Sequence, residues 1–355
     1  MKPPARRLGS PGTRPRAFTL VEVLVAVGIT AVLAAFMVTI VANVSGYWGR
    51  TSGRVSAEAQ ARFVLDRVAL DLQSAIYRDD GNVWLAANIL ANTGNTGLWT
   101  TTGSTANALK PANNAGSLQG IATGALTDAR FGIAGTWLRF FSVKPGTNAT
   151  TSTASAPVAV GYQIVRRATS GNEARSSDRR YLLHRTEVLP GRTSATATRL
   201  GTLESGFDLD PAKSGSPYNP TRNTAVTGDP AELRYPTINS VIAENVIDFG
   251  IRLHVRDASV SGGLRQVFPT SNANTSYRAR VPASVPSATE PFPEVVDVMV
   301  RVLTDEGARL LAAYEATPQR ITAPVGVTNQ AYWWQLAIAN SHVYTRRIVV
   351  AAGAY

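Results

Sequence analysis

Cysteine is absent from this 355-residue chain. Disulfide frameworks, thiol nucleophiles and thiolate metal sites are therefore excluded. An exported domain of this size can bury enough apolar surface to fold without disulfides, so the absence of cysteine does not argue for a cytoplasmic protein. Apolar residues make up 44% of the sequence, which is enough for a substantial core.

Histidine is also scarce. Only His184, His254 and His342 occur, far apart and within strand-like runs. No two of them have the i, i+4 spacing that places a zinc-binding pair on one helix face, so we interpret each as a strand residue. The sequence has no Gly-rich phosphate loop and no Gly-x-Ser-x-Gly elbow. We therefore predict no catalytic residue, no cofactor and no metal, and we do not expect an enzyme.

Two carboxylate pairs are weak candidates for a calcium site. Asp79–Asp80 and Asp208–Asp210 lie in loop-like sequence. Calcium takes six to eight oxygen ligands, so two carboxylates are too few to predict it. The pair Trp333–Trp334 stands at a helical pattern, where a place in the core is the simpler interpretation and a recognition patch is the alternative.

Acidic residues are missing from residues 1–17, which contain five basic side chains. The run from Val23 to Val44 that follows carries no charge. At about 1.5 Å per helical residue this run would extend roughly 33 Å, enough to cross the core of a bilayer. Positive charge before an apolar span keeps that end in the cytoplasm. We therefore predict a single-pass inner-membrane protein with a cytoplasmic N-terminus and a periplasmic C-terminal domain.

One carboxylate stands at the mouth of the apolar run. Glu22 follows Phe18 by four residues. A carboxylate in hydrocarbon costs on the order of a few kcal/mol and is by default a functional residue. The segment AFTLVE (residues 17–22), placed between a basic leader and an apolar helix, resembles the signal of type IV pilins. That family usually has Gly before the cut, and Ala17, the next smallest residue, stands here.

This resemblance implies three properties. They are cleavage by a prepilin peptidase between Ala17 and Phe18, N-methylation of Phe18, and a role for Glu22 in assembly. A plain membrane anchor and a secretory signal cut near Val32-Leu33-Ala34 remain alternatives. The apolar run is longer than the roughly 7–15 residues of a usual signal core, and an ordinary signal gains nothing from a carboxylate, so both are less favoured.

An amphipathic helix is expected after the apolar run. Three glycines between residues 46 and 53 should loosen the helix near the outer membrane interface, where Tyr47 and Trp48 suit the headgroup region. Helical periodicity resumes over residues 56–79, with a wide apolar stripe that would pack on a sheet. The opposite face is charged and contains Glu58, Arg62, Asp66 and Arg67.

The remaining chain reads as strands separated by long loops. Residues 81–128, 203–236 and 256–292 have loop composition. Strands are expected at 136–143, 158–167, 179–188, 241–255 (opening as a short helix or strand) and 294–303. A helix follows over 305–316, capped by Thr304, and then a short helix and a last strand. One sheet-rich domain with long inserted loops is the simplest organisation.

The order of a long helix followed by antiparallel strands is similar to that of pseudopilins, and in detail to the J-type minor pseudopilins of type II secretion. The chain also resembles the large pilin-like cassette proteins of Verrucomicrobia-type genomes. The resemblance implies an α+β pilin-like fold. It divides the chain into a cleaved leader (1–17), a transmembrane and assembly helix (18–45) and a periplasmic domain (46–355).

The resulting hypothesis is a structural subunit that assembles with other pseudopilins and inner-membrane components into a secretion pseudopilus or a pilus-like fibre. The alternative is a pilin-like module for DNA uptake or surface binding. Subtracting the five basic residues of the leader from the formal charge of +11 leaves +6, which is too mild to indicate nucleic acid by itself. An anchored periplasmic enzyme is disfavoured by the missing catalytic residues.

Overall fold

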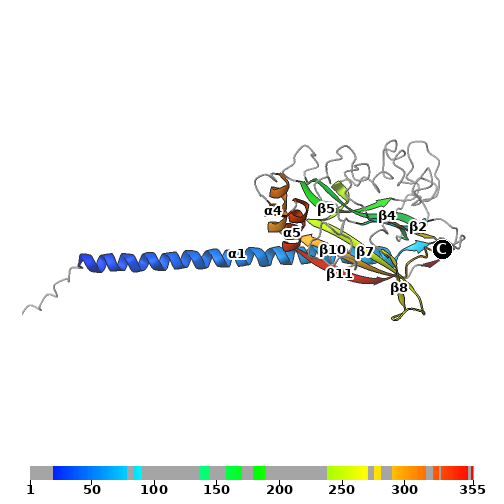
Figure 1. Ribbon diagram of the computed structural model, residues 1–355, viewed down its shortest axis with the longest axis horizontal. Coiled ribbons are helices and arrows are strands. Elements are labelled where there is room, and N and C mark those ends of the chain that lie inside the picture. Colours follow the sequence, from blue (N-terminus) through cyan, green and yellow to red (C-terminus); the bar gives the residue numbers. More distant parts are fainter. Residues whose placement is uncertain are drawn as a thin grey trace, which may run out of the picture. The chain divides into compact units, whose positions relative to one another are not determined.

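The computed structural model (Figure 1) describes eleven stretches of the chain. These are residues 19–77, 83–89, 136–143, 157–169, 179–188, 238–270, 276–280, 290–316, 323–327, 329–350 and 353–354. The helices are α1 (Leu20–Gln73), η5 (Ile238–Ser240), α4 (Asp305–Ala316) and α5 (Asn329–Ala339). The strands are β1 (Ile76–Tyr77), β2 (Val83–Ile89), β3 (Thr136–Val143), β4 (Pro157–Ala168), β5 (Arg179–Val188), β6 (Val241–Glu244), β7 (Val246–Arg256), β8 (Leu264–Phe268), β9 (Ser276–Arg280), β10 (Val295–Leu303), β11 (Ser341–Val349) and β12 (Gly353–Ala354).

The chain divides into two units, residues 1–52 and 53–355. In the first unit, the described part of α1 is exposed along its whole length. Its large apolar side chains between Leu20 and Val44 are 52–80% exposed. Among the described residues, α1 is the one helix long and apolar enough to span a membrane.

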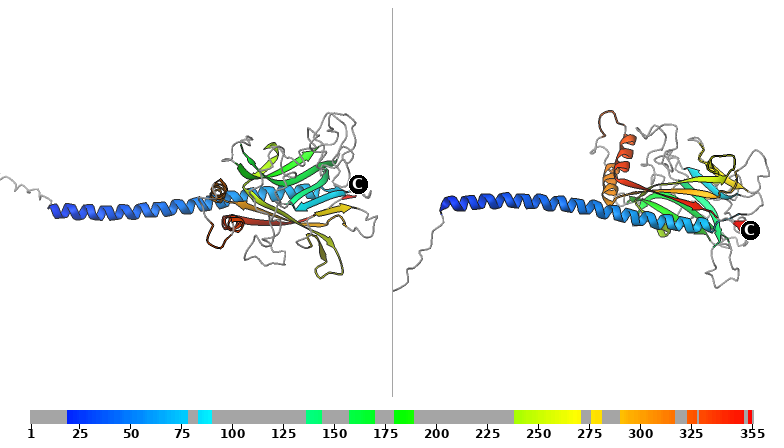
Figure 2. Two further views of the ribbon diagram at one scale, coloured as in Figure 1. Left: turned by 45° about the horizontal axis from the view of Figure 1, so that its top comes forward. Right: turned by 90° about the horizontal axis from the view of Figure 1, so that it is seen from below.

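The second unit contains two antiparallel sheets (Figure 2). One has six strands in the order β6-β5-β4-β3-β2-β9, and the other has four in the order β11-β10-β7-β8. The two sheets share one apolar core, in which Tyr162 of β4 stacks on Phe249 of β7 with ring centroids 6.0 Å apart. The helices α4 and α5 lie together at one end of this unit, away from the C-terminus (Figure 1).

The later part of α1 completes this core. Its buried side chains recur at helical spacing, at Ala57, Ala61, Val64, Val68 and Leu72. The helix also contacts the edge strand of each sheet. The amide of Glu244 in β6 donates to Gln60 Oε1 (3.2 Å), and Arg346 of β11 forms an ion pair with Asp66. The expected α+β fold, a long helix packed on antiparallel sheets, is therefore confirmed.

Several element predictions are confirmed in detail. Strands β3 and β5 have the predicted bounds, and so does α4. The hydroxyl of Thr304 accepts a hydrogen bond from the Gly307 amide (3.1 Å), as expected of an N-cap. All three histidines lie on strands, and both Trp333 and Trp334 are 2% exposed, which places them in the core.

Other element predictions are wrong. Strand β2 lies inside the predicted loop 81–128, and β8 and β9 lie inside the predicted loop 256–292. Residues 83–88 of β2 are buried on both faces, so they show no alternation, and the strand contains alanines, which have low β-propensity. Both β8 and β9 are short and rich in arginine and other polar residues, so the period-2 signal is weak.

The predicted end of the long helix is also wrong. Helix α1 continues through the three glycines and ends at Gln73, six residues before the predicted end. Beyond it, Ser74 and Ala75 pair with the end of β3. The Val143 amide donates to the Ser74 carbonyl (2.9 Å), and Ala75 bridges Ser142. Strand pairing at this point overrides local helix propensity.

Candidate functional site

Glu22 and Thr19 form a capping box at the start of α1. The Thr19 amide and hydroxyl donate to Glu22 Oε2 at 3.0 and 3.1 Å, and the Glu22 amide donates to the Thr19 hydroxyl at 3.3 Å. This reciprocal pattern satisfies amide groups that have no partner within the first turn of a helix. The Thr-x-x-Glu spacing was the sequence signal for this cap, which our sequence interpretation did not include.

The cap explains how Glu22 is oriented, but it does not remove the charge. The carboxylate lies at the beginning of a helix whose apolar side chains are exposed through Val44. Ala17 and Phe18, the residues that flank the predicted cut, lie outside the described residues, as do the carboxylate pairs Asp79–Asp80 and Asp208–Asp210.

The outward face of α1 in the second unit carries apolar as well as charged side chains. Val55, Phe63 and Leu70 are 61%, 56% and 59% exposed. Their spacing of eight and seven residues keeps them on one side of the helix. Only the charged residues of this face were predicted from the sequence, because the wider apolar stripe on the core side dominates the pattern.

The charged residues of this face are engaged within the chain itself. Arg62 pairs with Glu58 (2.5 Å), Asp66 pairs with Arg346, and Arg67 Nε lies 3.9 Å from Asp71. The charged face is thus less available to a partner than the sequence suggested.

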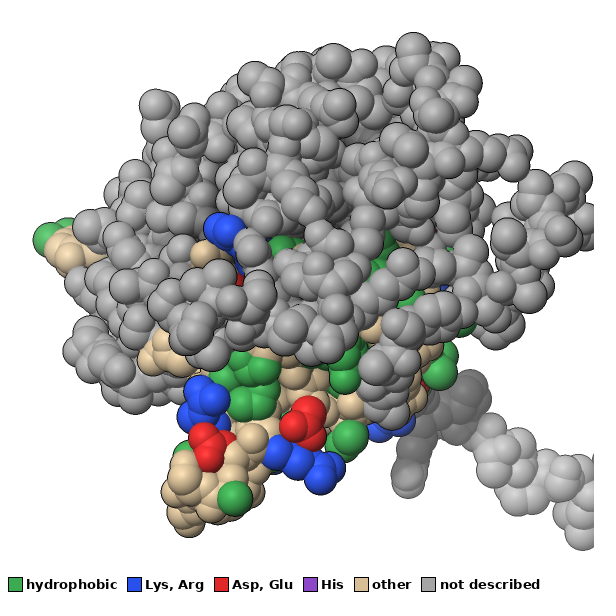
Figure 3. Space-filling view, turned by 90° about the vertical axis from the view of Figure 1, so that its right-hand side faces the viewer, with side chains coloured by type: hydrophobic (Ala, Val, Ile, Leu, Met, Phe, Trp, Pro, Cys, Tyr) green, Lys and Arg blue, Asp and Glu red, His purple; other side chains and the backbone are tan. Residues whose placement is uncertain are grey.

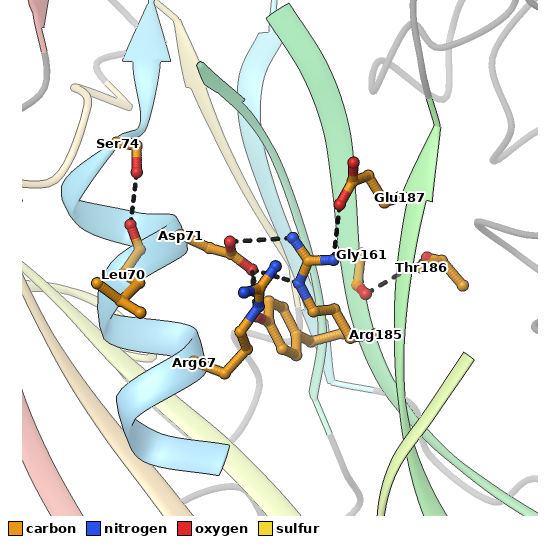
Figure 4. A network of polar contacts seen from close by, with 9 residues as sticks. Arg67, Leu70, Asp71, Ser74, Gly161, Arg185, Thr186 and Glu187 are labelled. Carbon is orange, nitrogen blue, oxygen red and sulfur yellow. Dashed lines mark hydrogen bonds and ion pairs between the residues drawn. The ribbon is translucent and has the colours of Figure 1, made fainter. Parts of the chain in front are cut away.

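A buried polar cluster holds the last turn of α1 against the six-stranded sheet (Figure 4). Arg185 of β5 donates through Nε and Nη2 to the two carboxylate oxygens of Asp71 at 2.5 and 3.0 Å. The hydroxyl of Tyr162 donates to the same carboxylate, and Arg185 Nη1 donates to Glu187 (2.8 Å). The side chains of Asp71 and Arg185 are each 10% exposed.

A second cluster, again built from a carboxylate, an arginine and a tyrosine, holds α4. Glu315, in the last turn of α4, accepts hydrogen bonds from Arg166 of β4 (3.0 Å) and from the hydroxyl of Tyr181 of β5. The indole of Trp333 in α5 also donates to Glu315 (2.9 Å). The side chains of Arg166 and Glu315 are 4% and 3% exposed. This ion pair is therefore almost completely removed from water.

Neither cluster was predicted from the sequence, although the sequence contains one signal for them. Asp71 and Glu315 lie in the last turns of their helices, where the helix dipole disfavours a negative charge and no basic residue is present. An acidic residue at such a position indicates a cationic partner elsewhere in the fold. Arg185 and Arg166 supply that charge.

Burial raises the pKa of both tyrosines in these clusters well above the ordinary value. Burial is the largest cause, and the adjacent carboxylates, Asp71 for Tyr162 and Glu315 for Tyr181, raise the pKa further. Each phenol is therefore held as a neutral hydrogen-bond donor. Both clusters consist of ion pairs and of hydrogen bonds donated to carboxylates. Their role is therefore to hold helices against the sheet.

In the part of the chain that the structure describes, no group of three or more His, Asp or Glu side chains is placed to hold a metal ion. Acidic and basic side chains are interspersed on the face drawn in Figure 3. Three exposed arginines of the second unit, Arg256, Arg265 and Arg347, are each paired with a carboxylate at 2.7–2.9 Å. Such pairing leaves these cations less available to phosphate groups.

Comparison with known proteins identifies one short motif. Residues 13–38 match the family model described as the prokaryotic N-terminal methylation motif. The match spans Ala17, Phe18 and Glu22 and most of the exposed apolar run. No curated protein and no solved structure matches the chain.

The matched motif agrees with the geometry of the described helix, which starts beside Glu22 and exposes an apolar surface suited to a membrane. Proteins that carry this motif are processed by prepilin peptidase and delivered to pilus assembly machinery, and they are structural rather than enzymatic. The chain therefore carries the N-terminal methylation motif of the type IV pilin-like proteins, which are structural rather than enzymatic, at the start of a helix that is long and apolar enough to span a membrane.

Proposed function

We propose that the chain is a minor pseudopilin of the J type, a subunit that assembles into a secretion pseudopilus or a related fibre. The observation that carries this proposal is the exposed apolar helix with a single carboxylate at its mouth. The basic leader (1–17) is removed, residues 18–45 span the membrane and later pack in the fibre, and residues 46–355 form the periplasmic domain. The N-terminus lies in the cytoplasm before cleavage.

The proposed role of Glu22 is to compensate the amino group of Phe18 on a neighbouring subunit. In an apolar bundle, an unpaired charge is expensive. Removing one partner of a buried pair costs about 3–5 kcal/mol, whereas the intact pair contributes much less. A subunit that enters in the wrong register would leave a charge unpaired in the apolar bundle, and this cost disfavours its incorporation. Glu22 should therefore matter for assembly and not for membrane insertion.

The capping box allows this electrostatic role to be separated from helix capping. Glu22→Gln keeps an acceptor for Thr19 but removes the charge, and Thr19→Ala removes most of the cap but keeps the charge. We expect Glu22→Gln and Glu22→Ala to insert normally and to fail in cross-linking to neighbouring subunits. Thr19→Ala should assemble nearly as well as wild type. Assembly of Glu22→Gln at the wild-type level would refute the register role.

The exposed apolar side chains of the second unit support a helix–helix interface. Val55, Phe63 and Leu70 extend the apolar surface of α1 past the membrane span. We propose that they pack against α1 helices of other minor pseudopilins. Phe63→Ala should weaken co-purification with pseudopilin domains encoded beside this chain, and Arg62→Ala, a neighbour on the same face, should not. Equal effects of the two substitutions would refute the apolar contact.

DNA uptake remains the alternative, favoured only by the net charge of +6 left after the leader is removed. DNA binding through phosphates would decline steeply as salt rises. Measurable binding of duplex DNA at low salt with that dependence would favour the alternative. The absence of binding at low salt would remove it.

A further inference from the structure

The two buried clusters occupy neighbouring positions on one pair of strands. Tyr162 of β4 is the cross-strand partner of Arg185 of β5. Four residues along, Arg166 of β4 is the partner of Tyr181 of β5. The two Tyr–Arg pairs therefore lie on the same face of the sheet, about 13 Å apart, with tyrosine and arginine exchanged between the strands. A single apolar pair, Ile164 and Leu183, separates them.

Each Tyr–Arg pair binds a carboxylate in the last turn of one helix. The first pair binds Asp71 of α1, and the second binds Glu315 of α4. Trp333 of α5 joins the second pair through its hydrogen bond to Glu315, so α4 and α5 are held together. The β4–β5 ribbon is thus the common support of α1 and of the α4–α5 pair.

Helix α1 also approaches the first turn of α4. A Cβ added at Gly53 of α1 would lie 3.6 Å from the Cβ of Thr304, the residue that caps α4. Thr304 in turn donates through its amide to the carbonyl of Asn340 at the end of α5 (3.0 Å). Both ends of α4 are therefore tied to neighbours, one to α1 and the α5 end, the other to the ribbon.

Apolar contacts alone would not fix the position of α1 along its own axis. Apolar burial is non-directional, and the α1 face against the core repeats small and branched residues every turn. A bidentate arginine–carboxylate contact has a defined geometry and is lost on a shift of one turn. Asp71 therefore makes the buried directional contact that helps to fix the axial register of α1, beside the more exposed pair Asp66–Arg346 and the backbone bond at Ser74. The ribbon that positions Arg185 also positions Arg166.

We propose that the β4–β5 ribbon couples the axial seating of α1 to the seating of the α4–α5 pair, so that neither helix element moves without the other. This coupling is a property of the chain itself and goes beyond the proposed assembly role. A force along the axis of α1 would therefore be transmitted through the β4–β5 ribbon to the α4–α5 pair, instead of making α1 slide along the sheets. Loosening of either cluster should be detected at the other.

Amide hydrogen exchange of the full chain in detergent micelles tests this coupling. Glu315→Gln should raise exchange over residues 64–73 of α1 about five-fold or more, relative to amides of β10, which report global opening. Asp71→Asn should raise exchange in α4 and α5 by a comparable factor, because coupling between two sites is reciprocal. Asp257→Asn, which breaks the ion pair with Arg265 of β8 and leaves β10 unaltered, is the control and should change neither.

The milder variants Tyr181→Phe and Tyr162→Phe each remove one hydrogen bond to a carboxylate and should show the same pattern at smaller amplitude. If a carboxylate variant fails to fold, the tyrosine variants still test whether the two clusters are coupled. The proposal is overturned if Glu315→Gln or Tyr181→Phe increases exchange only in α4, α5 and the strands they contact, with α1 unchanged relative to β10.

Discussion

Two aspartates of α1 provide a direct test of what burial does to an ion pair. Asp71 and Asp66 each pair with an arginine from a strand, Arg185 and Arg346 respectively. The side chains of the first pair are each 10% exposed, whereas Asp66 is 66% and Arg346 41% exposed. The same substitution, Asp→Asn, therefore removes the same charge from the same helix in two different environments.

The expected costs differ several-fold. Asp71→Asn leaves Arg185 buried with Glu187 as its carboxylate partner among the described residues, which should cost about 3 kcal/mol, the lower end for breaking a buried pair. Asp66→Asn should cost between zero and about 1 kcal/mol, as for exposed pairs. With a urea m-value of about 3 kcal/mol/M for a domain of this size, the Asp71 variant should lower the unfolding midpoint by about 1 M.

The assay is urea unfolding of the full chain in detergent, followed by the fluorescence of the buried tryptophans. The double variant Asp71→Leu with Arg185→Met should cost less than the sum of its two single substitutions, because it removes both charges of the pair instead of leaving one of them without the other. Equal midpoints for the Asp66 and Asp71 variants, or a double variant that costs the sum of its singles, would refute the reasoning from burial.

Two further predictions concern the same domain. Gly307→Ala should destabilise it by about 1–3 kcal/mol in urea unfolding, because an added Cβ would lie 2.5 Å from the Cβ and 2.7 Å from the carbonyl oxygen of Asn340. The control Arg309→Ala, at an exposed position, should change stability by less than about 0.5 kcal/mol. Equal costs would argue against this close approach. Stability should be lost in alkali, because the folded-state pKa values of Tyr162 and Tyr181 are raised: their contribution is complete below the unfolded pKa of about 10 and falls as the pH rises above it. The variant Tyr162→Phe with Tyr181→Phe should flatten this loss in unfolding midpoints measured from pH 9 upward, and an unchanged slope would contradict the assignment.

The agreement between sequence and structure follows the strength of the local signals. Strand β5 was predicted because a sequence rich in Ser, Gly and Asn precedes its apolar run. Helix α4 was predicted because Thr304 and two acids mark its first turn. Strand β2 was missed because burial on both faces removes the alternation that identifies a strand. The end of α1 was misplaced because pairing of Ala75 with Ser142 is a tertiary contact that local propensity does not contain.

The candidate site divides in the same way. Glu22 was found because a charge within a long apolar run is conspicuous in any sequence. The clusters around Asp71 and Glu315 depend on the register between β4 and β5, which brings Tyr162 opposite Arg185 and Arg166 opposite Tyr181. That register cannot be read from two separate strand patterns, because a shift of one residue would turn every side chain to the other face.

If this chain is matured as a pilin-like subunit, the N-terminal residue of the membrane-inserted protein must be the one that prepilin peptidase leaves. Mass spectrometry of the protein purified from membranes of a cell with prepilin peptidase should give a chain that begins at N-methylated Phe18. A chain that retains Met1, or one that begins just after Ala34, would contradict the account.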